Sequence, residues 1–217
     1  MKAMFTDRAE AGRLLAARLA VLQAAGRLVP PFVVLALPRG GVPVAAEVAR
    51  RLGAPLDLIQ VRKIGAPWQH ELAVAAVVDA GGREVVVDEA MCRGTGTSRT
   101  WVDEQAGIEW REIERRREAY GRGRAAPPVE GCTAIVVDDG IATGTTMRAA
   151  LLALRRRRPA HLVLAVPVAP HDALVVLGRE ADLVVCLAEP EPFRAVGQHY
   201  ADFHQVGDEE VIAALGA

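Results

Sequence analysis

One segment, residues 133–150, constrains the fold of this chain more than any other, because it predicts a buried strand joined closely to a helix. It reads T-A-I-V-V-D-D-G-I-A-T-G-T-T-M-R-A-A. The β-branched run 135–137 is typical of a strand, and the amphipathic pattern that begins near Thr145 is typical of a helix. Two adjacent carboxylates, Asp138 and Asp139, end the strand, and a loop of small residues separates them from the helix.

The chemistry of this unit suits a ligand that carries both a phosphate and sugar hydroxyls. Backbone N–H groups of the loop and the positive end of the helix dipole favour an anion, and the hydroxyls of Thr143, Thr145 and Thr146 add donors. Ionised Asp138 and Asp139 accept hydrogen bonds only, which suits hydroxyls beside the phosphate. We therefore expect a site for a polyhydroxylated phosphate ester. The alternative is an ordinary strand and a capped helix whose acids are solvated.

This arrangement resembles the phosphoribosyl-pyrophosphate (PRPP) signature of the type I phosphoribosyltransferases. The resemblance implies that Asp138 and Asp139 bind the ribose 2′ and 3′ hydroxyls. It also implies that the loop holds the 5′-phosphate, through Ala142, Thr143, Gly144, Thr145 and Thr146. Ala142 stands where the 6-oxopurine members carry an Asp that serves the purine ring, so the resemblance disfavours a hypoxanthine or guanine acceptor.

Strand and helix patterns alternate along the rest of the chain. Besides the strand at 135–137, we expect strands at 32–37, 56–61, 161–166 and 182–187, and helices at 7–25, 42–52, 172–178 and from 208. Residues 73–78 and 84–88 predict a hairpin, and His70 and Glu71 are expected in a loop. Nearly continuous apolar strands between helices predict an α/β fold with a doubly wound, mainly parallel sheet flanked by helices.

The domain organisation follows from the same resemblance. It implies a single phosphoribosyltransferase-like domain over residues 1–217, with a lid insertion at about 91–131 and a small hood at about 188–217. The insertion contains a polar helix, expected at 101–120, and ends in a Gly/Pro linker at 121–131. In the hood, three aromatic side chains either stack on an acceptor ring or fill a small satellite core: Phe193, Tyr200 and Phe203.

Two other loops are expected at the carboxyl ends of strands, where parallel sheets bind ligands. The loop 38–41 combines a planar donor fork, on Arg39, with two residues that let the backbone approach an anion closely, Gly40 and Gly41. It resembles the pyrophosphate loop of the family, which contains a cis peptide in many members. The alternative for this loop is a tight turn with a solvated arginine.

The second of these loops carries two basic residues. We expect Arg62 and Lys63 to end the strand at 56–61, where the family presents basic side chains to PRPP. The alternative is a solvated strand end.

The resemblance also implies the reaction, which is transfer of the 5-phosphoribosyl group from PRPP to a nitrogenous base with release of pyrophosphate. Displacement at ribose C1′ needs no covalent nucleophile, so positioning, charge stabilisation and exclusion of water carry the catalysis. Mg²⁺ is expected to bind mainly through PRPP and water, and no protein metal ligand is expected. The residues expected to act in catalysis are Arg39, Lys63, Asp138 and Asp139.

Composition limits the other classes of protein. A net charge of −1 gives no bulk attraction to nucleic acid, and the basic run 155–158 is expected to close the helix after the phosphate loop. No apolar run approaches the roughly 18 residues of a membrane span, and the charged start does not resemble a signal peptide, so a cytoplasmic protein is expected. Cys92, Cys132 and Cys186 predict neither a disulfide framework nor a zinc site.

Two rival functions stay open. A PRPP-binding regulatory protein could keep the fold without the transfer chemistry, although such proteins usually carry a nucleic-acid-binding surface that the low net charge does not predict. Recognition or hydrolysis of another phosphosugar is the other alternative. The resemblance implies a homodimer.

Overall fold

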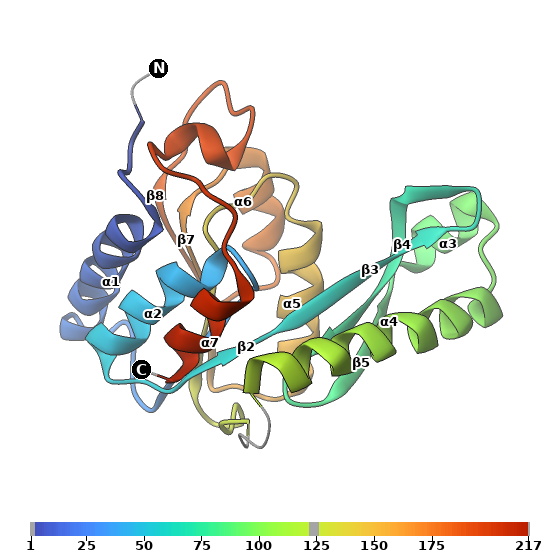
Figure 1. The fold of residues 1–217 in the computed structure, drawn as a ribbon, viewed down its shortest axis with the longest axis horizontal. Coiled ribbons are helices and arrows are strands. Elements are labelled where there is room, and N and C mark those ends of the chain that lie inside the picture. The colour runs from blue at the N-terminus through green and yellow to red at the C-terminus, as the bar shows by residue number, and fades with distance from the viewer. Residues whose placement is uncertain (1–2, 122–125, 217) are drawn as a thin grey trace.

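Two sheets organise the computed structural model, which describes residues 3–121 and 126–216 (Figure 1). A parallel sheet has the strand order β2-β1-β6-β7-β8. Its strands are β1 (Phe32–Ala36), β2 (Leu56–Leu58), β6 (Thr133–Val137), β7 (His161–Val168) and β8 (Leu183–Ala188). An antiparallel sheet has the order β3-β4-β5 and contains β3 (Gln60–Ala66), β4 (Gln69–Asp79) and β5 (Arg83–Val87).

Helices cover both faces of the parallel sheet, which confirms the predicted doubly wound α/β fold. Successive side chains of a strand point to opposite faces. Thus Val34 packs with α1 (Arg8–Ala24), α2 (Gly41–Leu52) and α7 (Asp208–Gly216), whereas Val33 and Leu35 pack with α5 (Thr145–Arg156) and α6 (His171–Leu177). Every residue of β1 and β6 is buried, as expected for strands covered on both sides.

The strand expected at 56–61 is divided between the two sheets, so its prediction was wrong in one respect. β2 ends at Leu58 beside β1, and the chain then enters β3, which pairs with β4. Buried Ile59 lies at the junction, which made the apolar run look continuous. Arg62 and Lys63 therefore lie inside β3 and do not end a strand.

The residues expected in a loop after this strand also form a strand. His70 and Glu71 belong to β4, because the β3–β4 ladder extends from Gln60↔Asp79 to Ala66↔Gln69. The hairpin predicted at 73–78 and 84–88 is confirmed by the pairing of β4 with β5. The first residues of β4, Gln69, His70 and Glu71, are polar, so the hydrophobic pattern did not show that the strand begins before residue 73.

The antiparallel sheet and the next two helices form an arm that projects from the parallel sheet, at the right of Figure 1. These helices are α3 (Glu89–Thr95) and α4 (Arg99–Gly121). They share an apolar core with the antiparallel sheet, which includes Ile64, Val74, Val77, Val102, Ala106 and Ile113. The predicted lid at 91–131 is therefore largely helical, and its closure over a ligand stays a prediction. Residues 122–125 of the predicted linker lie outside the described residues.

The hood aromatics form a satellite core against the N-terminal segment. Tyr200 is buried, and its ring centroid lies 5.3 Å from that of Phe5 and 5.1 Å from that of Phe203. Phe193 stacks on His199, which belongs to the short 3-10 helix η1 (Val196–His199). Tyr200 and Phe193 therefore fit the satellite-core alternative.

The basic run closes α5, as predicted. Its four arginines contact acidic side chains or a carbonyl: Arg155 pairs with Asp182, Arg156 with Glu84, Arg158 with Glu130, and Arg157 donates to the carbonyl of Ala80. Across the described ranges, no helix has the length and apolar character needed to cross a membrane.

Replacing one buried isoleucine of α4 tests the packing of the arm. Ile113 is 1% exposed in the arm core, whereas Ile108 on the same helix is 47% exposed. We expect Ile113→Ala to lower the free energy of unfolding by about 2–5 kcal/mol and Ile108→Ala to change it by less than about 0.5 kcal/mol. Urea unfolding followed by tryptophan fluorescence reports on the arm, because Trp68, Trp101 and Trp110 all lie in it. Equal losses for the two variants would contradict this packing.

Candidate functional site

The loops that follow β1 and β6 meet at the carboxyl edge of the parallel sheet. The two strands are neighbours with Ala36 opposite Val137, and the N–H of Leu37 donates to the carbonyl of Val137 at 3.0 Å. The loops that follow the two strands therefore begin side by side. A cavity of about 390 Å³ lies there, lined by Arg8, Arg39, Gly40, Asp138, Asp139 and the segment 203–206.

Two glycines let the loop 38–41 pack directly on the acids. A Cβ atom on Gly40 would collide with Oδ2 of Asp139, and one on Gly41 would lie 2.8 Å from the Cα of Asp138. The peptide between Pro38 and Arg39 is cis, as the family resemblance implied. Four of the predicted site residues are thereby brought together: Arg39, Gly40, Asp138 and Asp139.

Contacts from distant parts of the chain fix the position of Asp139. Its Oδ2 accepts a hydrogen bond from Nε of Arg8 at 2.8 Å, and its carbonyl accepts one from the hydroxyl of Tyr200 at 2.5 Å. Its own N–H donates to Oδ1 of Asp138 at 2.8 Å. Arg8 was not predicted as a site residue, because its contact spans 131 positions and leaves no local pattern.

The adjacent acids are electrostatically strained. Burial raises the pKa of Asp138 well above its ordinary value, and the neighbouring charge of Asp139 raises it further. Burial also raises the pKa of Asp139, while the hydrogen bond and charge of Arg8 act in the opposite direction. Two like charges beside one cavity are costly unless a ligand or a cation uses them.

A second predicted loop forms the N-terminal end of α5. Gly144 has φ 77°, the left-handed conformation that glycine adopts easily, and α5 begins at the next residue. No side chain in the described part of the chain caps this helix end. A cavity of about 610 Å³ opens beside it, and the predicted residues that line it are Ala142, Thr143, Gly144 and Thr145. Thr146 follows inside α5 and is partly buried.

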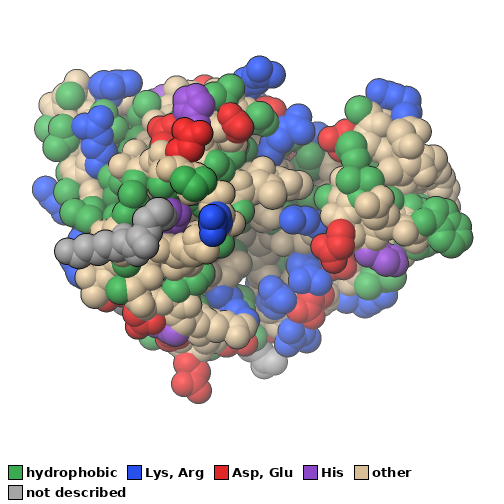
Figure 2. Space-filling model, turned by 90° about the horizontal axis from the view of Figure 1, so that it is seen from above, with side chains coloured by type: hydrophobic (Ala, Val, Ile, Leu, Met, Phe, Trp, Pro, Cys, Tyr) green, Lys and Arg blue, Asp and Glu red, His purple; other side chains and the backbone are tan. Residues whose placement is uncertain are grey.

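The two cavities flank one short segment. Asp139 lines the first and Ala142 lines the second, so only Gly140 and Ile141 separate the two linings along the chain. Figure 2 looks onto the molecule from above the view of Figure 1 and shows a hollow with Lys and Arg side chains around it.

Arg62 and Lys63 do not line either of these cavities. Arg62 lies on the face of the arm covered by α4, where its Nε contacts a carboxylate oxygen of Glu109 at 2.7 Å. Lys63 is exposed and opposite Ala76, whose side chain packs in the core that contains α5. Directly opposite residues of an antiparallel pair share a face, so Lys63 lies on the side of the arm that faces α5. The role of both residues in binding stays a prediction.

A carboxylate of α7 contacts Arg39. Oδ1 of Asp208 lies 3.4 Å from a terminal guanidinium nitrogen of Arg39, and the hydroxyl of Tyr120 donates to the same oxygen at 2.8 Å. These contacts connect the 38–41 loop with the last turns of α4. No sequence pattern indicates them, because the three residues lie far apart along the chain.

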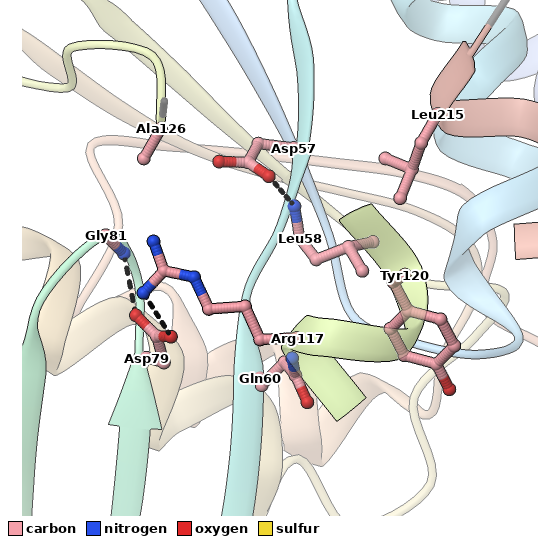
Figure 3. Close-up of a pocket in the computed structure, with 9 residues that line it drawn as sticks. All are labelled: Asp57, Leu58, Gln60, Asp79, Gly81, Arg117, Tyr120, Ala126 and Leu215. Carbon is pink, nitrogen blue, oxygen red and sulfur yellow. Dashed lines mark hydrogen bonds and ion pairs between the residues drawn. The ribbon is translucent and has the colours of Figure 1, made fainter. Parts of the chain in front are cut away.

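A smaller cavity of about 60 Å³ lies where β2, β4, α4 and α7 meet (Figure 3). An ion pair between Arg117 and Asp79, with 3.4 Å between nitrogen and oxygen, crosses part of it, and Asp79 also accepts the N–H of Gly81. Ligand sites for drug-sized molecules have volumes of roughly 300–1,000 Å³, so this cavity is too small for a phosphorylated sugar. None of the predicted site residues lines it.

Gly40→Ala tests how tightly the two loops pack. We expect this variant to lower the free energy of unfolding by about 1–3 kcal/mol, because the added methyl group collides with the fixed carboxylate of Asp139. Gly107→Ala is the control, since its Cβ meets nothing within 4 Å and alanine favours the interior of α4 by about 0.5–1 kcal/mol. Thermal unfolding of both variants measures the difference, and a neutral Gly40→Ala variant would contradict the packing.

Asp138→Asn tests the electrostatic strain. Because the pKa of Asp138 is raised in the folded state, the wild-type protein loses stability as the pH rises from the ordinary carboxyl value, about 3.9, through the raised value. Asparagine does not titrate. We therefore expect the variant to melt at least about 2 °C above wild type at pH 8, with the difference disappearing below about pH 4. A difference that does not vary with pH would contradict this interpretation.

Comparisons with known proteins show the family of this chain. A family model described as "Phosphoribosyl transferase domain" matches residues 29–179. The chain is 48% identical over 212 residues to "Putative phosphoribosyl transferase Rv0571c" of Mycobacterium tuberculosis (strain ATCC 25618 / H37Rv). That alignment covers 98% of this chain and 46% of the relative, so the chain spans about half the length of the curated relatives it matches.

A solved structure resembles the whole chain closely. The crystal structure of TT1426 from Thermus thermophilus is 43% identical to it, with a TM-score of 0.84 and 97% of both chains covered. With the family model and the relatives, this similarity shows that the chain belongs to the phosphoribosyl transferase domain family.

Proposed function

We propose that this chain transfers the 5-phosphoribosyl group from PRPP to a nitrogenous base and releases pyrophosphate. One observation carries the proposal: two loops whose chemistry suits anions lie on either side of a pair of adjacent carboxylates at one sheet edge. PRPP has the matching order of groups, with a 5′-phosphate and a pyrophosphate on the two sides of one ribose.

Each part of the substrate has a chemically suitable partner in this arrangement. Asp138 and Asp139 would accept hydrogen bonds from the ribose hydroxyls. The exposed N-terminal end of α5 and the hydroxyls of Thr143 and Thr145 would hold the 5′-phosphate. The guanidinium of Arg39 and the closely packed backbone of its loop would face the pyrophosphate.

Binding of pyrophosphate at this loop would require Arg39 to exchange partners. Arg39 lies 3.4 Å from Asp208, and both side chains are only partly buried. An exposed ion pair of this kind contributes little, so a multiply charged pyrophosphate would compete with it readily. Mg²⁺ would enter as the complex with PRPP and would withdraw charge from the leaving group.

In the proposed reaction, the C1′–O bond to pyrophosphate breaks and a C1′–N bond to the base forms, through an oxocarbenium-like transition state. The electron pair of the broken bond leaves with pyrophosphate. A base nitrogen that carries a proton releases it to water, whereas a pyridine nitrogen carries none and becomes positively charged. The side chains supply orientation and charge stabilisation, and no protein nucleophile takes part.

The identity of residue 142 narrows the proposed acceptor. Ala142 lines the cavity beside α5, at the position where the resemblance places an Asp in 6-oxopurine enzymes. An alanine offers no acid or base to a purine ring. We therefore propose an acceptor other than hypoxanthine or guanine. The proposed homodimer rests on the family resemblance, and sedimentation velocity tests it.

Pyrophosphate release from Mg²⁺–PRPP across a panel of purine, pyrimidine and pyridine bases tests the function. We expect pyrophosphate release to depend on one acceptor. Its rate should fall about 10- to 100-fold in Asp138→Asn, because this variant loses a charge-assisted contact to the ribose. Asp103→Asn on the exposed side of α4 is the matched control and should retain the rate.

Three results would contradict the proposal. Absence of PRPP binding by calorimetry would exclude the substrate. Tight PRPP binding without pyrophosphate release in the presence of any base would instead favour the PRPP-binding regulatory protein. Preference for another phosphosugar over PRPP would favour the remaining alternative.

A further inference from the structure

Arg8 is buried even though it carries a charge and lies at the start of a helix. It is the first residue of α1 and is 7% exposed. The cap of the helix does not involve its side chain, because Asp7 caps α1 by accepting the N–H of Glu10. The burial of Arg8 therefore has a cause outside its own helix.

The guanidinium of Arg8 joins three distant parts of the chain. Its Nε donates to Oδ2 of Asp139 at 2.8 Å, and a terminal nitrogen donates to the carbonyl of His204 at 2.8 Å. Its central carbon lies 3.8 Å from the ring centroid of Phe203, a close cation–π contact. Arg8, Phe203 and His204 all lie outside the residues that match the family model.

Stability alone does not account for this ion pair. Desolvation of two buried charges can exceed their attraction, so an apolar pair of similar volume would often serve the fold equally well. The pair instead lies on the wall of the cavity that Asp138 and Arg39 also line. A buried polar contact with good geometry fixes the orientation of its partner, which here is a predicted ribose-binding carboxylate.

The titratable groups around Asp139 come from several elements. The adjacent loop residue Asp138 is acidic, Arg39 lines the same cavity from the loop after β1, and Tyr200 donates to the carbonyl of Asp139 from the hood. The ring of His204 is engaged with Asp202 and Glu210. Arg8 is the cation in direct contact with the carboxylate of Asp139.

We propose that Arg8 is a positioning residue that holds Asp139 as a fixed, ionised acceptor and directs its Oδ1, the oxygen that Arg8 does not use, toward the ligand. The contact also ties α1 and the segment 202–206 to the candidate site. The proposal rests on the proposed function for the identity of the ligand, but the state of the carboxylate is measurable without any ligand. The opposing effects of burial and Arg8 on the pKa of Asp139 support it.

A carboxyl ¹³C NMR titration of the protein without added ligand tests the proposal, with Asp139→Asn used to assign the signal. We expect Asp139 of the wild-type protein to be ionised at pH 7. In Arg8→Met, which removes the cation and keeps a long apolar side chain, the midpoint should rise by about one pH unit or more. Arg8→Lys keeps the charge and should show a smaller rise.

Arg13→Met is the matched control, because Arg13 lies on the same helix, its side chain is largely exposed, and it pairs at a distance of 3.9 Å with Glu47 and not with Asp139. It should leave the midpoint of Asp139 unchanged. A midpoint that does not move in Arg8→Met, or that moves equally in Arg13→Met, would overturn the proposal. A wild-type Asp139 that is protonated at pH 7 would also overturn it, whether or not the Arg8 variants fold.

Calorimetric titration with Mg²⁺–PRPP links this carboxylate to binding. Relative to wild type, we expect the affinity of Arg8→Met to fall about 10-fold or more at a pH below the Asp139 midpoint that NMR measures in this variant. The loss should be smaller at a pH above that midpoint, where Asp139 is ionised. A loss of affinity that does not vary with pH would indicate a purely structural role and would contradict the proposal. If wild-type protein does not bind PRPP, the proposed function fails, while the NMR titration still decides the role of Arg8.

Discussion

The parallel pairing of β1 with β6 positions the candidate site of this protein, because it brings two loops together at one sheet edge. The register runs from Phe32↔Thr133 to Ala36↔Val137, and both strands are buried throughout. A slip of one residue would turn every core side chain of a strand to the opposite face. The same register sets Gly40 against Asp139. The hydrophobic core therefore fixes the distance between the proposed pyrophosphate and ribose contacts.

This placement has an electrostatic cost that the surrounding structure offsets. Asp138 and Asp139 are held side by side with raised pKa values, and contacts from the two ends of the chain restrain Asp139. Arg8 approaches from α1 and Tyr200 from the hood. Arg8 of α1 and residues 203–206 of the hood, which lie outside the family-matched core, thus complete the wall of the candidate site. A strained pair of acids suits the proposed role of this site, which is to receive hydroxyl donors.

Features that depend on neighbouring residues could be predicted from the sequence, whereas those that depend on distant contacts could not. The strand, acids, loop and helix from Thr133 to Arg156 follow one another within a single unit, so their pattern identified the fold. The same pattern predicts the core of the candidate site. The division at Ile59 was missed because an apolar run does not show with which sheet it pairs. Arg8 and Asp208 were missed because each reaches the site from far along the chain.

In the proposed complex, one PRPP molecule spans both loops with its ribose on the paired acids. A crystal structure of the protein with Mg²⁺–PRPP tests this most directly. We expect the 5′-phosphate at residues 142–146, ribose hydroxyls on Asp138 and Asp139, and pyrophosphate at Arg39 with the contact to Asp208 broken. A PRPP molecule bound elsewhere, or bound with its phosphates exchanged between the two loops, would contradict this arrangement.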